Sequence, residues 1–212
     1  MKIIDVYKKF QIPPNLQDHM LRVCAIVEFI QKHWIGKHVD WDLTKKIAML
    51  HDLGNIVKYN FDNHPEFLGK EQKNIEHWRD VQSEIIKKYG SDDDEVTKKM
   101  LTELGLGGEI VEIIFSKRFG NSVEVKNSDN WALKIMYYAD LRTLPFGIGS
   151  LEERISDIKG RMPKYTSRPD FEELLDACRS IEKQLLPNID VPANEINDRN
   201  VLIDKTLLNL SL

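Results

Sequence analysis

The stretch KKIAMLHDLGNIVKY, from Lys45 to Tyr59, places apolar residues at helical spacing and then interrupts them with a histidine and an aspartate. His51 lies four residues after Ile47, so it continues the face that the pattern assigns to the interior. Asp52 follows at the flank of that face, and we call the pair the dyad. A buried carboxylate is costly unless a partner compensates for its charge, so the rest of the chain should supply that partner.

Two other helical patterns turn a polar residue inward in the same way. His19 shares an apolar stripe with Val23, and Asp140 shares one with Met136. With the dyad, they form a mixed nitrogen and oxygen ligand set that suits Fe, Zn, Ni or Mn. A lone histidine on an apolar face is most often a core residue. It is the joint occurrence of four such groups that favours a metal site.

These four residues resemble the H…HD…D signature of the HD-domain metal-dependent phosphohydrolases. The segments HMLRV, AMLHDLG and YYADLR resemble the corresponding segments of that family, and the resemblance covers about residues 15–160. It implies an all-α fold, an HD-domain-like helical bundle, and hydrolysis of a nucleotide or another small phosphate ester by metal-activated water. It also implies one divalent transition metal ion, bound by His19, His51, Asp52 and Asp140.

The chain departs from this family pattern at two places. Many members have Lys or Glu three residues after the aspartate of the dyad, where this chain has Asn55. Members with two metal ions carry two more histidines before the last aspartate. His77 stands where the first could be, but the segment expected to supply the second offers Lys117 and Arg118. Because that basic pair would repel a cation, we expect one tightly bound ion rather than two.

The leading hypothesis gives catalytic roles to Asp52, Lys117 and Arg118. Asp52 would bind the metal and position or deprotonate the attacking water, while the basic pair would offset charge on the phosphate. An exposed helix end explains the basic pair equally well.

Three further residues are candidates for binding the substrate. Arg22 lies one turn beyond His19, Arg142 lies two residues after Asp140, and His64 lies in the loop that follows the dyad. The arginines could instead form salt bridges with neighbouring helices, and His64 could be a loop residue without a role.

Two rival readings remain open. A non-catalytic metal- and nucleotide-binding module with an HD-like fold is consistent with Asn55 and with the missing histidines. A purely helical interaction domain would require all four inward polar groups to be coincidental. The glycine-rich turns GIGS and GLGG follow no strand, so a dinucleotide site is not supported, and no GxSxG motif is present.

The periodicity predicts helices joined by turns, a long loop over 60–72, and no strand. The expected helices span 2–10, 15–34, 41–53, 72–89, a segment that starts at Ser91, 107–118, 128–143, 150–160 and 169–186. We expect an HD-type phosphohydrolase core over 1–160 and a C-terminal helical extension over 161–212 that packs on it. The apolar tail could pack on its own chain or on a second subunit, so a homo-oligomer is possible.

The composition limits the binding partners and the cellular compartment that we expect for this protein. With 42% hydrophobic and 30% charged residues the chain is of the globular kind, and it has no apolar run of the ~18 residues that a membrane span needs. A net charge of −4 argues against bulk nucleic-acid binding and leaves a small phosphate ester as the expected partner. The N-terminal residues lack a secretory apolar core, and the two cysteines lack metal-type spacing. Both features predict a cytoplasmic protein.

Overall fold

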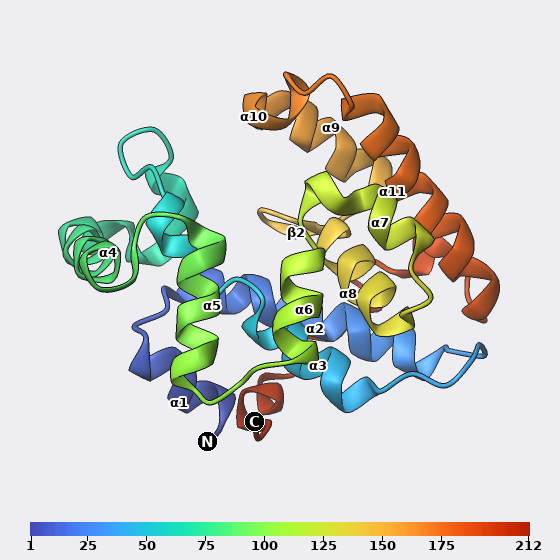
Figure 1. The fold of residues 1–212 in the computed structure, drawn as a ribbon, viewed down its shortest axis with the longest axis horizontal. Helices are drawn as coiled ribbons and strands as arrows, with labels where there is room; N and C mark the ends of the chain where they lie inside the picture. The colour runs from blue at the N-terminus through green and yellow to red at the C-terminus, as the bar shows by residue number, and fades with distance from the viewer.

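Helices form nearly all of the computed structural model, which describes residues 1–212 (Figure 1). The α-helices are α1 (Ile3–Lys9), α2 (Pro14–Lys32), α3 (Trp41–Leu50), α4 (Ile75–Tyr89), α5 (Asp93–Glu103), α6 (Glu109–Ser116), α7 (Ser122–Asn127), α8 (Trp131–Leu141), α9 (Leu151–Arg161), α10 (Pro163–Thr166) and α11 (Phe171–Leu185). The 3₁₀ helices are η1 (Asn55–Lys58), η2 (Pro65–Asn74), η3 (Phe119–Asn121), η4 (Leu186–Asn188), η5 (Ala193–Glu195) and η6 (Lys205–Asn209). The predicted all-α class is confirmed. None of these helices combines the length and the apolar character that crossing a lipid bilayer requires.

Side-chain caps set the start of four helices. Asp40, Asp92, Asn130 and Ser150 precede α3, α5, α8 and α9, and each accepts a hydrogen bond from the backbone N–H three residues later. Such caps satisfy amide groups that the first turn of a helix leaves free. Glu153 bonds back to the amide of Ser150, which completes a capping box on α9. These short polar signals explain why the predicted and observed helix starts agree closely.

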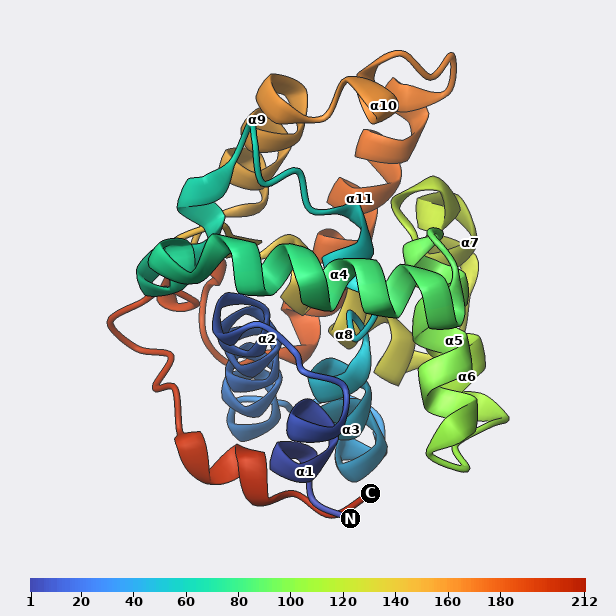
Figure 2. The same ribbon diagram turned by 90° about the vertical axis from the view of Figure 1, so that its left-hand side faces the viewer.

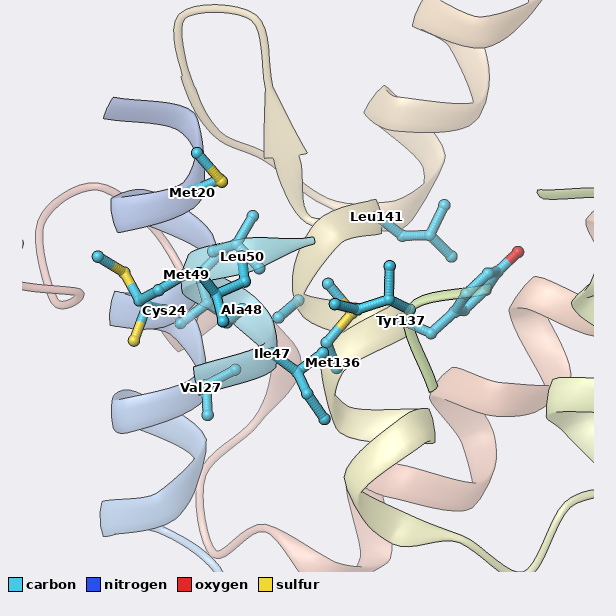
Figure 3. Packing of buried hydrophobic residues seen from close by; sticks show 14 of the residues in the cluster. Met20, Cys24, Val27, Ile47, Ala48, Met49, Leu50, Met136, Tyr137 and Leu141 are labelled. Atoms are coloured by element: carbon cyan, nitrogen blue, oxygen red, sulfur yellow. The ribbon is translucent and has the colours of Figure 1, made fainter. Parts of the chain in front are cut away.

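The core lies where α2, α3 and α8 meet (Figure 3). α2 packs along α3, and both helices pack against α8. Apolar side chains from all three helices fill the space between them, including Met20, Val27, Ile47, Met49 and Met136. His19 lies on α2, Asp140 lies on α8 and the dyad directly follows α3, so this part of the core supports all four predicted metal ligands.

The C-terminal segment belongs to the same hydrophobic cluster as the rest of the chain. α11 packs against α7 and α8, and η6 packs against α1 and α2. The amide of Leu212 donates to the carbonyl of Met1 at 3.0 Å, so the two chain ends lie side by side (Figures 1 and 2). The tail therefore packs on its own chain here. The predicted division into 1–160 and 161–212 stays a prediction.

Three local features differ from the sequence-based prediction. The helix expected over 41–53 ends at Leu50, and the dyad lies in the turn that leads to η1. Part of the expected 60–72 loop is the 3₁₀ helix η2, which Pro65 starts. An antiparallel hairpin of β1 (Thr143–Leu144) and β2 (Gly147–Ile148) follows α8. Strands of two residues are too short to show an alternating pattern.

A close backbone contact holds the turn that carries the dyad. The amide of Gly54 donates to Thr97 Oγ1 at 2.9 Å, which ties this turn to α5. A Cβ atom at position 54 would lie 2.5 Å from the carbonyl oxygen of Asp93 and 2.7 Å from the amide nitrogen of Thr97. Both are backbone atoms of α5, so they cannot rotate away. Only glycine lets α5 lie this close to the dyad.

We predict that Gly54→Ala destabilises the protein by about 1–3 kcal/mol, because the added methyl group overpacks a rigid contact. Thermal or urea unfolding measures the change. Gly160→Ala is the matched control, since a Cβ at position 160 of α9 meets no atom within 4 Å and alanine favours a helix. Equal stability of the Gly54→Ala variant and the wild type would contradict the account.

Candidate metal centre

Four potential ligand atoms from three helical segments face a single point. His19 lies on α2, the dyad follows α3, and Asp140 lies in the last turn of α8. His19 Nε2 is 3.3 Å from His51 Nε2, 3.4 Å from Asp52 Oδ2 and 3.3 Å from Asp140 Oδ1. His51 Nε2 is 3.5 Å and 3.7 Å from the same two carboxylate oxygens. The predicted convergence of the four side chains is confirmed.

The hydrogen bonding of His51 fixes which ring nitrogen faces that point. Its Nδ1 lies 2.8 Å from the carbonyl oxygen of Ala48, which can only accept, so Nδ1 carries the hydrogen. Nε2 of the neutral ring is then a lone-pair donor. Lone pairs of four groups directed at one point repel one another unless a cation lies between them. The two imidazole nitrogens lie 3.3 Å apart and 3.3–3.7 Å from an oxygen of each carboxylate, which suits a divalent ion between them.

Lys117 adds a positive charge beside the two carboxylates. Its Nζ lies 2.6 Å from Asp52 Oδ1 and 4.0 Å from Asp140 Oδ2. Burial alone would raise the pKa of the Asp52 carboxyl, but nearby positive charge, that of Lys117 included, holds that pKa well below its usual range. Burial would lower the pKa of Lys117, yet the charges of Asp52 and Asp140 raise it. The two carboxylates are therefore ionised, and the amine is an ammonium group.

A cavity of about 790 Å³ opens onto this cluster, and His19, Asp52 and Asp140 form part of its wall. Lys117 and Arg118 line the same cavity, as do Asn55 and Lys58. Three of the predicted metal ligands and the predicted basic pair thus line one cavity. A ligand in the cavity could contact both.

Lys58 and Arg118, like Lys117, have acidic partners on this wall. Lys58 Nζ lies 2.8 Å from Asp93 Oδ2, and Arg118 Nε lies 2.6 Å from Asp94 Oδ2. Lys58 lies six residues after Asp52, a spacing that predicts no role from sequence. Its place on η1, directly after the dyad turn, brings it to the cavity.

The family model described as HD domain matches residues 16–144. This range is well over half of the chain and contains all four converging side chains. The chain belongs to the HD domain family. Comparisons with curated proteins and with solved structures gave no match. HD domains bind divalent metal ions, so family membership and the ligand geometry point to the same centre.

The side chain of Arg142 stabilises the fold of this HD domain. This corrects the sequence-based prediction that Arg142 binds the substrate. The side chain is buried and does not line the cavity. Its Nε donates to the carbonyl of Gly149, and its Nη1 donates to the Tyr138 hydroxyl at 2.6 Å. Its Nη2 donates to the carbonyls of Ala193 and Ile196 at 3.1 and 2.7 Å. Arg142 therefore joins α8, the hairpin and the C-terminal segment.

The other two candidates for substrate binding also lie outside the wall of the main cavity. Arg22 Nη1 is 3.5 Å from the carbonyl oxygen of Leu144. His64 Nδ1 is 3.0 Å from Glu66 Oε1, and His64 lines an adjoining pocket of about 440 Å³. That pocket shares Arg161 with the main cavity. Substrate contacts by Arg22 and His64 stay predictions.

We predict that the purified HD domain carries about one divalent ion per chain and that chelation lowers its melting temperature. His51→Ala should lose the ion, because that imidazole supplies one of the four ligand atoms. Elemental analysis measures the metal content.

His77→Ala is the matched control, since His77 is exposed and does not line the cavity. Metal content that survives His51→Ala but falls with His77→Ala would place the ion elsewhere. Two ions per chain would contradict the expectation of a single ion.

Proposed function

We propose that this HD domain is a metal-dependent phosphohydrolase that acts on a nucleotide or another small phosphate ester. One observation carries the proposal: two imidazole nitrogens and two carboxylate oxygens face one point in the wall of a cavity, beside an ammonium group. A divalent ion held there supplies Lewis-acid chemistry, which acidifies water and polarises a phosphoryl oxygen. Family membership supports the proposal, since HD domains are in general metal-dependent phosphohydrolases.

The two oxygens of Asp52 have different surroundings, and these define its proposed role. Oδ1 accepts from Lys117 Nζ at 2.6 Å, whereas Oδ2 faces the two imidazoles. The salt bridge keeps the carboxylate from rotating, so Oδ2 stays directed at the ion site. A carboxyl whose pKa lies well below its usual range is also a weak base. We therefore assign Asp52 to holding the ion and orienting water by a hydrogen bond rather than to removing a proton.

Lys117 is the group best placed to bind the reacting phosphate. An ammonium has three N–H donors, and Asp52 Oδ1 occupies one of them. The remaining donors can bind phosphate oxygens and offset the negative charge that develops during transfer. Arg118 gives its Nε–H to Asp94 and keeps its other N–H donors, so it can assist. We assign the larger effect to Lys117 because its ammonium lies beside the carboxylates of Asp52 and Asp140.

The alternative is a non-catalytic metal- and nucleotide-binding module. Asn55 favours it, because this buried amide lines the cavity where many members of the family carry an acid or a base. An amide neither accepts nor releases a proton in the physiological range. The two functions differ in one outcome: only the enzyme releases phosphate.

The direct test is a phosphate-release assay with protein loaded separately with Fe²⁺, Zn²⁺, Ni²⁺ or Mn²⁺. Substrates are nucleoside mono-, di- and triphosphates and sugar phosphates. We expect release in at least one metal form, and a loss of about 100-fold or more in Asp52→Asn. Asp42→Asn, an exposed change on α3, is the matched control. Bound metal without turnover of any ester would favour the binding module.

We predict that Lys117→Met lowers kcat by about 10²–10³-fold, because the phosphate loses its ammonium partner. The metal content should stay close to that of the wild type, since none of the four ligand atoms is removed. Steady-state kinetics and elemental analysis on the same sample separate the two effects. Lys87→Met, an exposed change near the end of α4, is the control. Unchanged kcat in Lys117→Met would rule out the role that we assign to this residue.

A further inference from the structure

The cavity beside the metal centre extends to a second group of cationic side chains. Arg154 and Arg161 lie on α9, Lys164 lies on α10, and Arg168 follows α10, and all four line the cavity. We call these four residues the α9–α10 cluster. Figure 1 shows α9 and α10 together at the end of the molecule opposite α1. At about 790 Å³ the cavity has the size of sites that enclose a whole small molecule. The metal centre therefore forms only one part of the available binding space.

The two arginines on α9 share a single carboxylate. Arg154 Nη1 and Arg161 Nη2 each lie 2.6 Å from Asp157 Oδ2. Positions 154, 157 and 161 fall on one face of the helix, so the sharing follows from the sequence spacing. One carboxylate neutralises one guanidinium, which leaves a positive charge on this face of α9.

The other two members of the cluster add to the excess of positive charge. Arg168 pairs with Asp170, while Lys164 has no carboxylate partner. The cluster thus has four cations for two carboxylates. Arg168 also lies flat against Gly120, because its Nη1 is 3.3 Å from the position that a Cβ there would occupy. Gly120 follows Lys117 by three residues, so Arg168 connects the cluster to the wall beside the metal centre.

Two residues of the cavity wall have a buried polar atom without a hydrogen-bond partner. Arg154 Nε and Asn15 Oδ1 are the two buried side-chain polar atoms without a hydrogen-bond partner. Both residues line the cavity. Buried donors and acceptors are normally satisfied, and those that are not are often completed by water or a ligand. A ligand that reorganises the α9–α10 wall would give the Arg154 guanidinium an acceptor.

We propose that the cavity binds small molecules with two phosphate groups, one at the metal centre and the other on the α9–α10 cluster. Guanidinium groups suit the second phosphate because their paired N–H donors match its oxygens. The assignment of the first phosphate to the metal centre rests on the proposed function. The substrate class is thus a bisphosphate rather than a simple monophosphate.

Binding of matched probes to Mn²⁺-loaded protein tests this inference without any turnover. One pair is adenosine 3′,5′-bisphosphate and adenosine 5′-monophosphate, and the other is hexane-1,6-diol bisphosphate and hexyl phosphate. Calorimetry should show at least one bisphosphate binding about tenfold or more tightly than its monophosphate, since charge-assisted hydrogen bonds are the stronger kind. If neither bisphosphate binds more tightly than its partner, the proposal is wrong.

Two double variants locate the effect. Arg161→Gln with Lys164→Gln removes two charges from the cluster while Arg154 keeps Asp157 paired. It should reduce the bisphosphate advantage, which is the ratio of bisphosphate to monophosphate affinity, to about threefold or less. Monophosphate binding should stay unchanged. Lys159→Gln with Arg179→Gln removes the same charge from sites outside the cavity, and this control should keep the advantage. An equal loss in both double variants would mean bulk charge rather than a site, and would overturn the proposal.

The outcomes separate this inference from the proposed function. A bisphosphate advantage that depends on the cluster, without phosphate release from any ester, would support the inference and reject the enzyme. Phosphate release that Asp52→Asn abolishes, without a bisphosphate advantage in either pair, would support the enzyme and reject the inference.

Discussion

The mutual repulsion of four lone-pair donors is the constraint on which this structure depends. The imidazole nitrogens of His19 and His51 lie 3.3 Å apart, and each lies 3.3–3.7 Å from a carboxylate oxygen of Asp52 and of Asp140. No fold would hold these groups together in a partly buried place without a compensating positive charge. α2, α3 and α8, whose side chains make up the centre of the core, provide the rigid support. Gly54 adds to it by letting α5 pack directly on the turn that carries the dyad.

Lys117 adds a compensating positive charge between the metal centre and the cavity. Its ammonium lies beside the second oxygen of Asp52. Lys117 therefore adds positive charge next to the ion site. This arrangement leaves lysine donors for a phosphate. The wide cavity beyond it, with its second set of cations, leaves room for a larger anion than a single phosphate.

Sequence reasoning succeeded where the signal was local and failed where it depended on tertiary structure. Helical periodicity and the inward polar residues identified the helices and the four converging side chains. Arg142 was misassigned because nearness in sequence to Asp140 suggested nearness in space, whereas residues two apart on a helix point in different directions. Lys58 and the α9–α10 cluster were missed because no fixed spacing links them to the dyad. Only the path of the chain through η1, α9 and α10 brings these cations to one cavity.

A crystal structure with anomalous diffraction recorded at the absorption edges of Fe, Ni, Zn and Mn tests the central claim most directly. The account predicts a single anomalous peak about 2.0–2.3 Å from each of four atoms. Those atoms are His19 Nε2, His51 Nε2, Asp52 Oδ2 and Asp140 Oδ1. A metal-loaded crystal with no peak between these atoms, or with the peak at other side chains, would contradict it.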